Sequence, residues 1–179
     1  MNLKPQDILF LLKLVSNQEK PWTFNKLAVE LGMSPSEVHG SAQRCLAAKL
    51  ALNQDGAITP HARNLMEFLE HGIQYAFVPD MGSVSRGMLT AHAAAPFDLV
   101  ISESELPPVW PDPDGKDSGI SFSPLYKSVP FAARADEALY ELLVAVDCIR
   151  AGRARERKWA ITMLKERIVS PDAKAKSKS

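Results

Sequence analysis

The sequence predicts a mainly helical fold with a small β component, and three observations lead to that prediction. Apolar residues recur at helical spacing in several stretches of the 179-residue chain. The pair Asp55-Gly56 separates two short segments and is typical of a β-hairpin turn. Most of the thirteen prolines lie between residues 79 and 130, where long helices are therefore not expected. We expect helices at both ends of the chain and an extended middle.

The composition indicates a protein of the cytoplasm without a membrane segment. Hydrophobic residues make up 46% of the chain, enough for a well-packed core. The sequence has no apolar run of about 18 residues and no secretory signal at its start, so neither membrane insertion nor secretion is expected. The two cysteines, Cys45 and Cys148, lie on apolar helical stripes and are expected to be small buried residues in a reducing compartment.

Residues 4–17 form the first expected helix, and their apolar face is broad enough for contacts on two sides. A second helix is expected to open at Thr23 and to end at Gly32, because glycine suits the left-handed conformation of a helix C-terminus. The third helix is marked by Ser34 as N-cap and by Glu37 three residues later, which together form a capping box. Two helices joined by a tight glycine turn are typical of a helix-turn-helix.

A hairpin is expected directly after these helices. Residues 50–53 alternate in polarity, Asp55-Gly56 can form the turn, and residues 57–59 can return as a strand. Helix, turn, helix and hairpin together resemble the winged helix-turn-helix superfamily, and within it the MarR-type bacterial regulators. The resemblance covers about the first 70 residues.

The resemblance implies a sequence-specific DNA-binding transcriptional regulator, expected as a homodimer that reads double-stranded DNA through the helix beginning at Pro35. Its polar face would meet base edges and phosphates, the start of the preceding helix would contact the backbone, and the hairpin would act as a wing. Arg44 is the strongest single candidate, since guanidinium suits guanine or phosphate. The candidate DNA-binding residues are Thr23, Lys26, Ser34, Ser36, His39, Gln43, Arg44, Asn53 and Gln54.

Residues 1–72 would form this winged helix-turn-helix, closed by a helix over residues 60–71 with Gly72 as its stop. That helix could either mediate dimerisation or close the core. Residues 73–130 are expected to hold short strands at 73–78 and 119–126 within an ordered irregular, proline-rich segment. Apolar side chains are expected to anchor this segment to the helices, among them Met81, Val84, Leu99, Val100 and Ile101.

Residues 131–169 are expected to form a C-terminal helical pair, and residues 170–179 a disordered tail. The two helices, over residues 136–150 and 153–169, are interrupted at Ala151-Gly152. The N-terminus of a helix carries partial positive charge, which disfavours cations there. An arginine-rich stretch at the start of the last helix therefore suggests that some of these side chains have a defined binding partner. The partner could be DNA phosphates, RNA, an acidic partner protein, or acidic groups of the same chain, either Asp147 or the region 103–117. The residues are Arg150, Arg153, Arg155, Arg157 and Lys158.

Charge is unevenly distributed along a chain whose net charge is zero. Residues 1–72 are balanced, residues 73–130 are acidic and residues 131–179 are basic. Because non-specific affinity for DNA comes largely from neutralised phosphates, the first region should bind weakly without help from a second subunit or from the arginine-rich stretch.

No enzyme is predicted. The four histidines have no metal-ligand spacing, and the sequence lacks a phosphate-binding glycine loop and a nucleophile elbow, so neither metal nor cofactor is expected. The loop around Arg86 and His92 could bind a small ligand or a partner. This gives one alternative function, a ligand sensor.

The second half carries motifs such as SRGMLTAHAAAP, VWPDPDG and FSPLYKSVP. They are similar to bacterial winged-helix proteins described as predicted transcriptional regulators. Some resemble antitoxin-like regulators of two-gene toxin–antitoxin systems, whose C-terminal region engages a toxin. That resemblance implies another alternative, a module that binds a protein partner encoded nearby.

Overall fold

The structure is a computed structural model that describes residues 1–18, 20–98 and 105–170. Within these ranges the chain is mainly helical, with one small hairpin and one small three-stranded barrel. The elements follow in the order α1 (Pro5–Asn17), α2 (Phe24–Leu31), α3 (Pro35–Ala47), β1 (Ala51–Gln54), β2 (Ala57–Pro60), α4 (Ala62–His71), α5 (Ile73–Ala76), β3 (Met81–Leu89), η1 (Ala91–Ala93), β4 (Pro108–Pro111), β5 (Asp117–Phe122), α6 (Val129–Arg134), α7 (Glu137–Ala151) and α8 (Ala154–Ile168).

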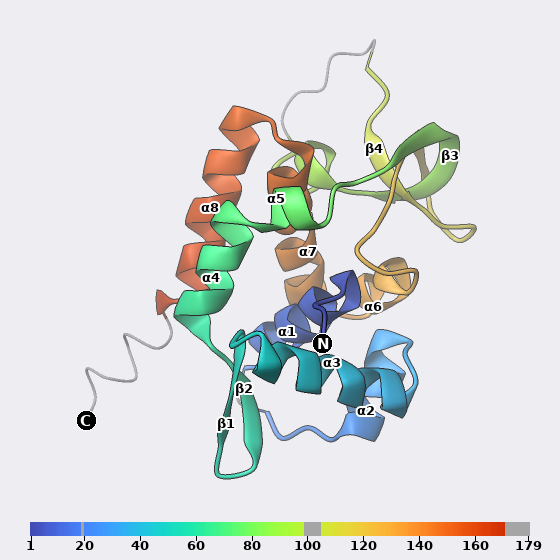
Figure 1. Cartoon of the computed structure of the whole chain (residues 1–179). Helices are drawn as coiled ribbons and strands as arrows, with labels where there is room; N and C mark the ends of the chain where they lie inside the picture. The colour runs from blue at the N-terminus through green and yellow to red at the C-terminus, as the bar shows by residue number, and fades with distance from the viewer. Residues whose placement is uncertain (19, 99–104, 171–179) are drawn as a thin grey trace.

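Helix α7 is the centre of the molecule. Every residue from 142 to 150 is buried, and the helix packs against α1, α4, α5, α6, α8 and η1. The β1–β2 hairpin projects from one end, and the barrel lies at the other (Figure 1). A helix with neighbours on every side must be apolar all round, which explains the long apolar run of its sequence.

Helix α1 is the second fully packed element. Its residues 7–14 are all buried, and it lies between α3 on one side and α7 on the other. The broad apolar face predicted for this helix is thereby explained, because α1 joins the N-terminal helices to the C-terminal ones. One continuous core results.

The local signals of the N-terminal region have the predicted consequences. Gly32 ends α2 in the left-handed conformation with φ 64°. Ser34 and Glu37 form the capping box of α3. Asp55 and Gly56 both have positive φ, 52° and 88°, in the tight turn between β1 and β2.

The prediction of a strand over residues 73–78 is wrong. Gly72 does not take a left-handed conformation but stays right-handed, with φ −115° and ψ −39°, so the chain continues into the short helix α5. Ile73 is buried against α7 by this continuation. The apolar stripe of α4 is also buried within the chain, where α4 packs against α7 and α8, and α4 therefore closes the core.

The segment expected to be irregular contains a small closed barrel. Strand β3 pairs antiparallel with both β4 and β5, and β4 and β5 pair parallel. The second predicted strand, 119–126, corresponds to β5, which begins and ends earlier. The barrel closes tightly, because a Cβ placed on Gly87 would lie 2.0 Å from the backbone oxygen of Trp110 in β4, and one on Gly119 would lie 1.9 Å from that of Pro107, just before β4.

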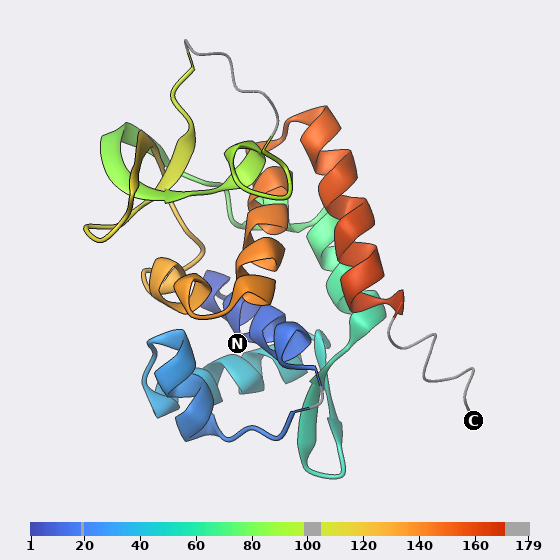
Figure 2. The ribbon, with the colours of Figure 1, turned by 180° about the vertical axis from the view of Figure 1, so that it is seen from behind.

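The C-terminal helices lie close to their predicted ranges, with Gly152 left-handed at the junction of α7 and α8. Helix α6 was not predicted, and it packs on α2 (Figure 2). Of the predicted disordered tail, residues 171–179 lie outside the described residues, as do Leu99, Val100 and Ile101, which were expected to anchor the middle segment.

Candidate functional site

The exposed face of α3 is polar and consists of small or medium side chains. Ser36, His39 and Gln43 are exposed, whereas Val38, Ala42 and Cys45 on the opposite side are buried in the core. The His39 ring packs edge-on against Phe24 of α2, with ring centroids 5.3 Å apart. The contact limits the positions that the imidazole can take, while its exposed edge stays free to meet a ligand.

The start of α3 is formed by a reciprocal pair of hydrogen bonds. The Glu37 amide donates to Ser34 Oγ at 3.2 Å, and the Ser34 amide donates to Glu37 Oε2 at 2.8 Å. The Ser34 hydroxyl is thus used as a cap, although the residue itself is exposed.

Arg44 does not belong to the exposed face. Its Nε and Nη2 donate to the carboxylate of Asp7 on α1, at 2.7–3.1 Å, and the arginine side chain is only 14% exposed. Asp7 is completely buried. The guanidinium lies back over Gly40, whose missing side chain leaves room for it. The prediction of Arg44 as the strongest DNA contact is therefore corrected, because the geometry makes it the group that fastens α3 to α1.

The other predicted N-terminal contacts flank α3 on exposed positions. Thr23 Oγ1 accepts from the Lys26 amide at 3.1 Å and so caps α2, leaving the Lys26 side chain exposed. In the hairpin, Asn53 Oδ1 accepts from the Gly56 amide at 3.0 Å and shapes the turn, and Gln54 is exposed beside it. Asn53 is thus held by its own turn, whereas Lys26 and Gln54 are free to contact a partner.

The surface charge of this region differs from its formal charge. Among the described residues up to 72, five basic side chains are exposed, against two acidic ones, Asp55 and Glu67. The exposed basic residues are Lys4, Lys20, Lys26, Lys49 and Arg63. Three of the remaining acidic side chains form ion pairs within the chain: Asp7 with Arg44, Glu30 with Lys13 and Glu70 with Lys165. Among the described residues of this region, exposed basic side chains therefore outnumber exposed acidic ones, although the formal count of residues 1–72 is balanced.

Arg150 is not available to a phosphate. It is buried at the centre of the molecule, where Nη1 donates to Asp147 Oδ1 at 2.8 Å and to the Ser123 carbonyl at 3.1 Å, and Nε donates to the Phe77 carbonyl at 2.9 Å. Asp147 also accepts from Thr90 Oγ1 and Trp110 Nε1, both at 2.7 Å. The alternative of an internal partner thus holds for Arg150, and this network fastens the barrel to α7.

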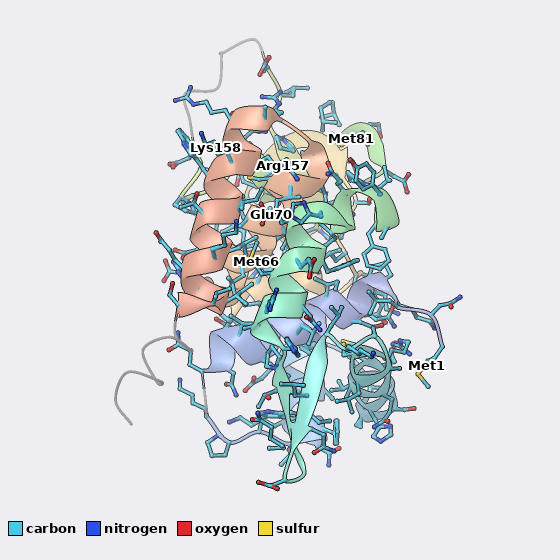
Figure 3. All side chains as sticks on the ribbon, turned by 60° about the vertical axis from the view of Figure 1, so that its left-hand side comes forward. Met1, Met66, Glu70, Met81, Arg157 and Lys158 are labelled. Carbon is cyan, nitrogen blue, oxygen red and sulfur yellow. The ribbon has the colours of Figure 1, made fainter. Side chains whose placement is uncertain are left out.

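The remaining basic residues of that stretch lie at the start of α8. Arg155 stacks on Trp159 at 4.7 Å, and Arg157 Nη2 donates to the Glu70 carbonyl at 2.5 Å. Arg153 has a long ion pair with Glu105 at 3.9 Å, and Lys158 is exposed. Arg157 and Lys158 lie at the end of the molecule opposite the hairpin (Figure 3). The two residues are therefore remote from the β1–β2 hairpin.

The predicted ligand loop is divided between two places. Arg86 is exposed on β3, opposite Ser118 of β5. His92, on η1, lines a groove of about 570 Å³ together with apolar side chains of the segment before β3, the start of β4 and β5. Burial lowers the pKa of His92, and the neighbouring positive Arg153 lowers it further, so the imidazole is neutral near pH 7. The two residues do not form one site.

One residue of this region was missed by sequence reasoning. Tyr126, between β5 and α6, donates its hydroxyl to Glu37 Oε1 at 2.5 Å. The two residues are 89 positions apart, so no local pattern indicates the contact.

No protein-family model, curated protein or solved structure matches this chain. Within the described ranges no helix is both long and apolar enough to cross a bilayer. Over the same residues, no three side chains of the metal-binding types gather as an ion would need.

Proposed function

We propose that this protein is a sequence-specific DNA-binding regulator and that residues 1–72 act as a winged helix-turn-helix. In this proposal α3 enters the major groove, the start of α2 contacts the sugar-phosphate backbone, and the β1–β2 hairpin acts as the wing. Two copies of the chain bind one operator, so that two α3 helices read two half-sites about 34–36 Å apart.

The main support for the proposal is the polar composition of the exposed face of α3. Ser36, His39 and Gln43 are three donors or acceptors of a size that fits base edges, and no large apolar side chain is exposed on this helix. A face that binds a protein partner would be expected to present aromatic or aliphatic anchors, and the face of α3 presents none.

The distribution of exposed charge supports the same function. Five exposed basic side chains in the N-terminal region provide the phosphate contacts that position a reading helix. Among them, Lys26 follows the cap of α2 and Lys49 follows α3. Three of the acids of this region, Asp7, Glu30 and Glu70, are paired with cations of the same chain.

The testing experiment is a titration of the protein with fluorescent duplexes tiled across the DNA upstream of its own gene. The Ser36→Glu/Gln43→Glu variant places two negative charges on the exposed face of α3, facing the duplex. We expect its dissociation constant on the best wild-type duplex to rise at least 100-fold, because repulsion is added to two lost base contacts of about 1–3 kcal/mol each.

The matched control reverses charge at the other end of the molecule, with Arg155→Glu/Lys158→Glu. This variant should bind the same duplex with an affinity within about threefold of wild type, because exposed charges beyond a Debye length are largely screened. If α3 charge reversal leaves binding intact, or if both variants lose it equally, the assignment of α3 as the reading helix is wrong.

A further inference from the structure

The first turn of α3 is held from two directions by a single carboxylate. Glu37 Oε2 accepts from the Ser34 amide at 2.8 Å and completes the capping box, while Oε1 accepts from the Tyr126 hydroxyl at 2.5 Å. The hydrogen bond from Tyr126, followed by those at Ser34, lowers the pKa of Glu37 to about 2. The carboxylate is thus ionised throughout the physiological range and remains an acceptor for the Tyr126 hydroxyl near neutral pH.

Tyr126 is itself fixed to the opposite half of the molecule. Three residues before it, the Ser123 carbonyl accepts from the buried Arg150, and Ser123 Oγ accepts from the Asp80 amide at 2.8 Å. The segment that carries Tyr126 is therefore tied to α7 and to the start of the barrel. A displacement of α7 or of the start of the barrel would therefore be transmitted to α3 through Tyr126.

Helix α6 adds a second contact at the same place. A Cβ built on Gly32, in the turn between α2 and α3, would lie 3.0 Å from Cδ1 of Phe131 and 3.1 Å from Cβ of Ser128. The glycine is therefore needed for close packing as well as for its left-handed φ of 64°. The turn and the first residues of α3 are covered on this side by the C-terminal half.

Helix α3 thus has two polar anchors on one flank. Arg44 fastens its last turns to α1, and Glu37 fastens its first turn to Tyr126. His39 lies on the other flank, against Phe24 of α2. The exposed residues Ser36 and Gln43 lie between these flanks, so the orientation of the reading face depends on both anchors.

We propose that Tyr126 is a positioning residue for DNA binding, which holds the first turn of α3 in the orientation that fits the major groove. The inference rests on the proposed function and deepens it, because it assigns to the C-terminal half a direct part in setting DNA affinity. Whatever binds the barrel or α7 can then alter DNA binding by moving the segment that carries Tyr126.

The test removes one oxygen with Tyr126→Phe and measures three quantities. In the free protein, amide hydrogen exchange at Glu37, Val38 and His39 is expected to become about 3–10-fold faster, because the variant lacks one ordinary hydrogen bond that stabilises this turn. In an NMR titration, the pKa of Glu37 should rise toward its usual value. On the best wild-type duplex, the dissociation constant should rise about 3–10-fold as well.

The matched control is Tyr140→Phe. The Tyr140 hydroxyl donates to the Leu89 carbonyl at 2.6 Å, a bond of the same type between α7 and β3. This variant should lose a similar amount of stability, with exchange at the start of α3, the pKa of Glu37 and DNA affinity all unchanged.

The sign of the pH effect gives a separate check. Because the folded pKa of Glu37 lies below its ordinary value of 4.5, the stabilising contribution of this contact is complete above about pH 5 and is lost as the pH falls toward 2. The wild-type chain should lose stability over this interval more steeply than Tyr126→Phe.

Each outcome decides the inference. If exchange and the pKa of Glu37 change but DNA affinity does not, the contact exists and the positioning role is wrong. Unchanged exchange in Tyr126→Phe also overturns it. If the wild-type protein binds none of the upstream duplexes, the proposed function itself fails, and the positioning role fails with it.

Discussion

An Asp147→Ala variant is expected to lose about 3–5 kcal/mol of unfolding free energy, the cost typical of breaking a buried ion pair from one side. The substitution leaves the guanidinium of Arg150 buried without its carboxylate, and it removes the acceptor of Thr90 Oγ1 and Trp110 Nε1. Urea unfolding followed by circular dichroism gives the measurement.

Glu141→Ala is the matched control for this variant. Glu141 also lies on α7 and pairs with an arginine, Arg167 at 2.5 Å, but both side chains are partly exposed. A surface pair of this kind contributes at most about 1 kcal/mol. If Asp147→Ala costs no more than Glu141→Ala, the buried network does not fasten the barrel to α7.

The Arg44→Ala variant is expected to lose about 3 kcal/mol, because it leaves the fully buried Asp7 without its cation. The Lys4 amide still donates to Asp7 Oδ2 at 2.8 Å, which keeps the cost at the lower end of the range for such pairs. Thermal or urea unfolding measures the loss, and DNA affinity must be compared at a temperature where the variant is fully folded.

Gln43→Ala, one residue earlier, is the control that distinguishes an effect on protein stability from an effect on DNA binding. Gln43 is exposed and should change stability by no more than about 0.5 kcal/mol, while it weakens DNA binding. The opposite result, with Gln43→Ala destabilising and Arg44→Ala neutral, would contradict the assignment of the two side chains.

The comparison of Gln43 with Arg44 shows what sequence reasoning could and could not predict. The capping box at Ser34 and Glu37, the glycine end of α2 and the turn at Asp55-Gly56 depend on neighbouring residues, so their signals are complete in the sequence. The partner of Arg44 is Asp7, 37 positions away, and only the folded chain brings them together.

The barrel was missed for a related reason. Strand β3 reads MGSVSRGML and has little alternation of large apolar residues, because most of it faces solvent and its closure depends on glycine at Gly87. Met81 and Val84, expected as buried anchors, are more than half exposed. The non-local pairing of β3 with β4 and β5 cannot be read from local periodicity.

The exposed charge of the N-terminal region could not be predicted from the formal count, because that count treats all side chains alike. Asp7, Glu30 and Glu70 count as negative in the sequence, but each is neutralised by an internal partner. The exposed charge is what a duplex meets, and it can be obtained only from the folded chain.

Hydrogen–deuterium exchange of the full chain, with and without its best upstream duplex, tests whether α3 reads DNA. We expect protection on DNA binding in three segments: the start of α2 from residue 23, α3 over residues 35–43, and the hairpin turn at residues 53–56. The start of α8, over residues 153–158, should exchange at the same rate in both samples. Protection at the start of α8 without protection of α3 would show that α3 is not the helix that binds the duplex.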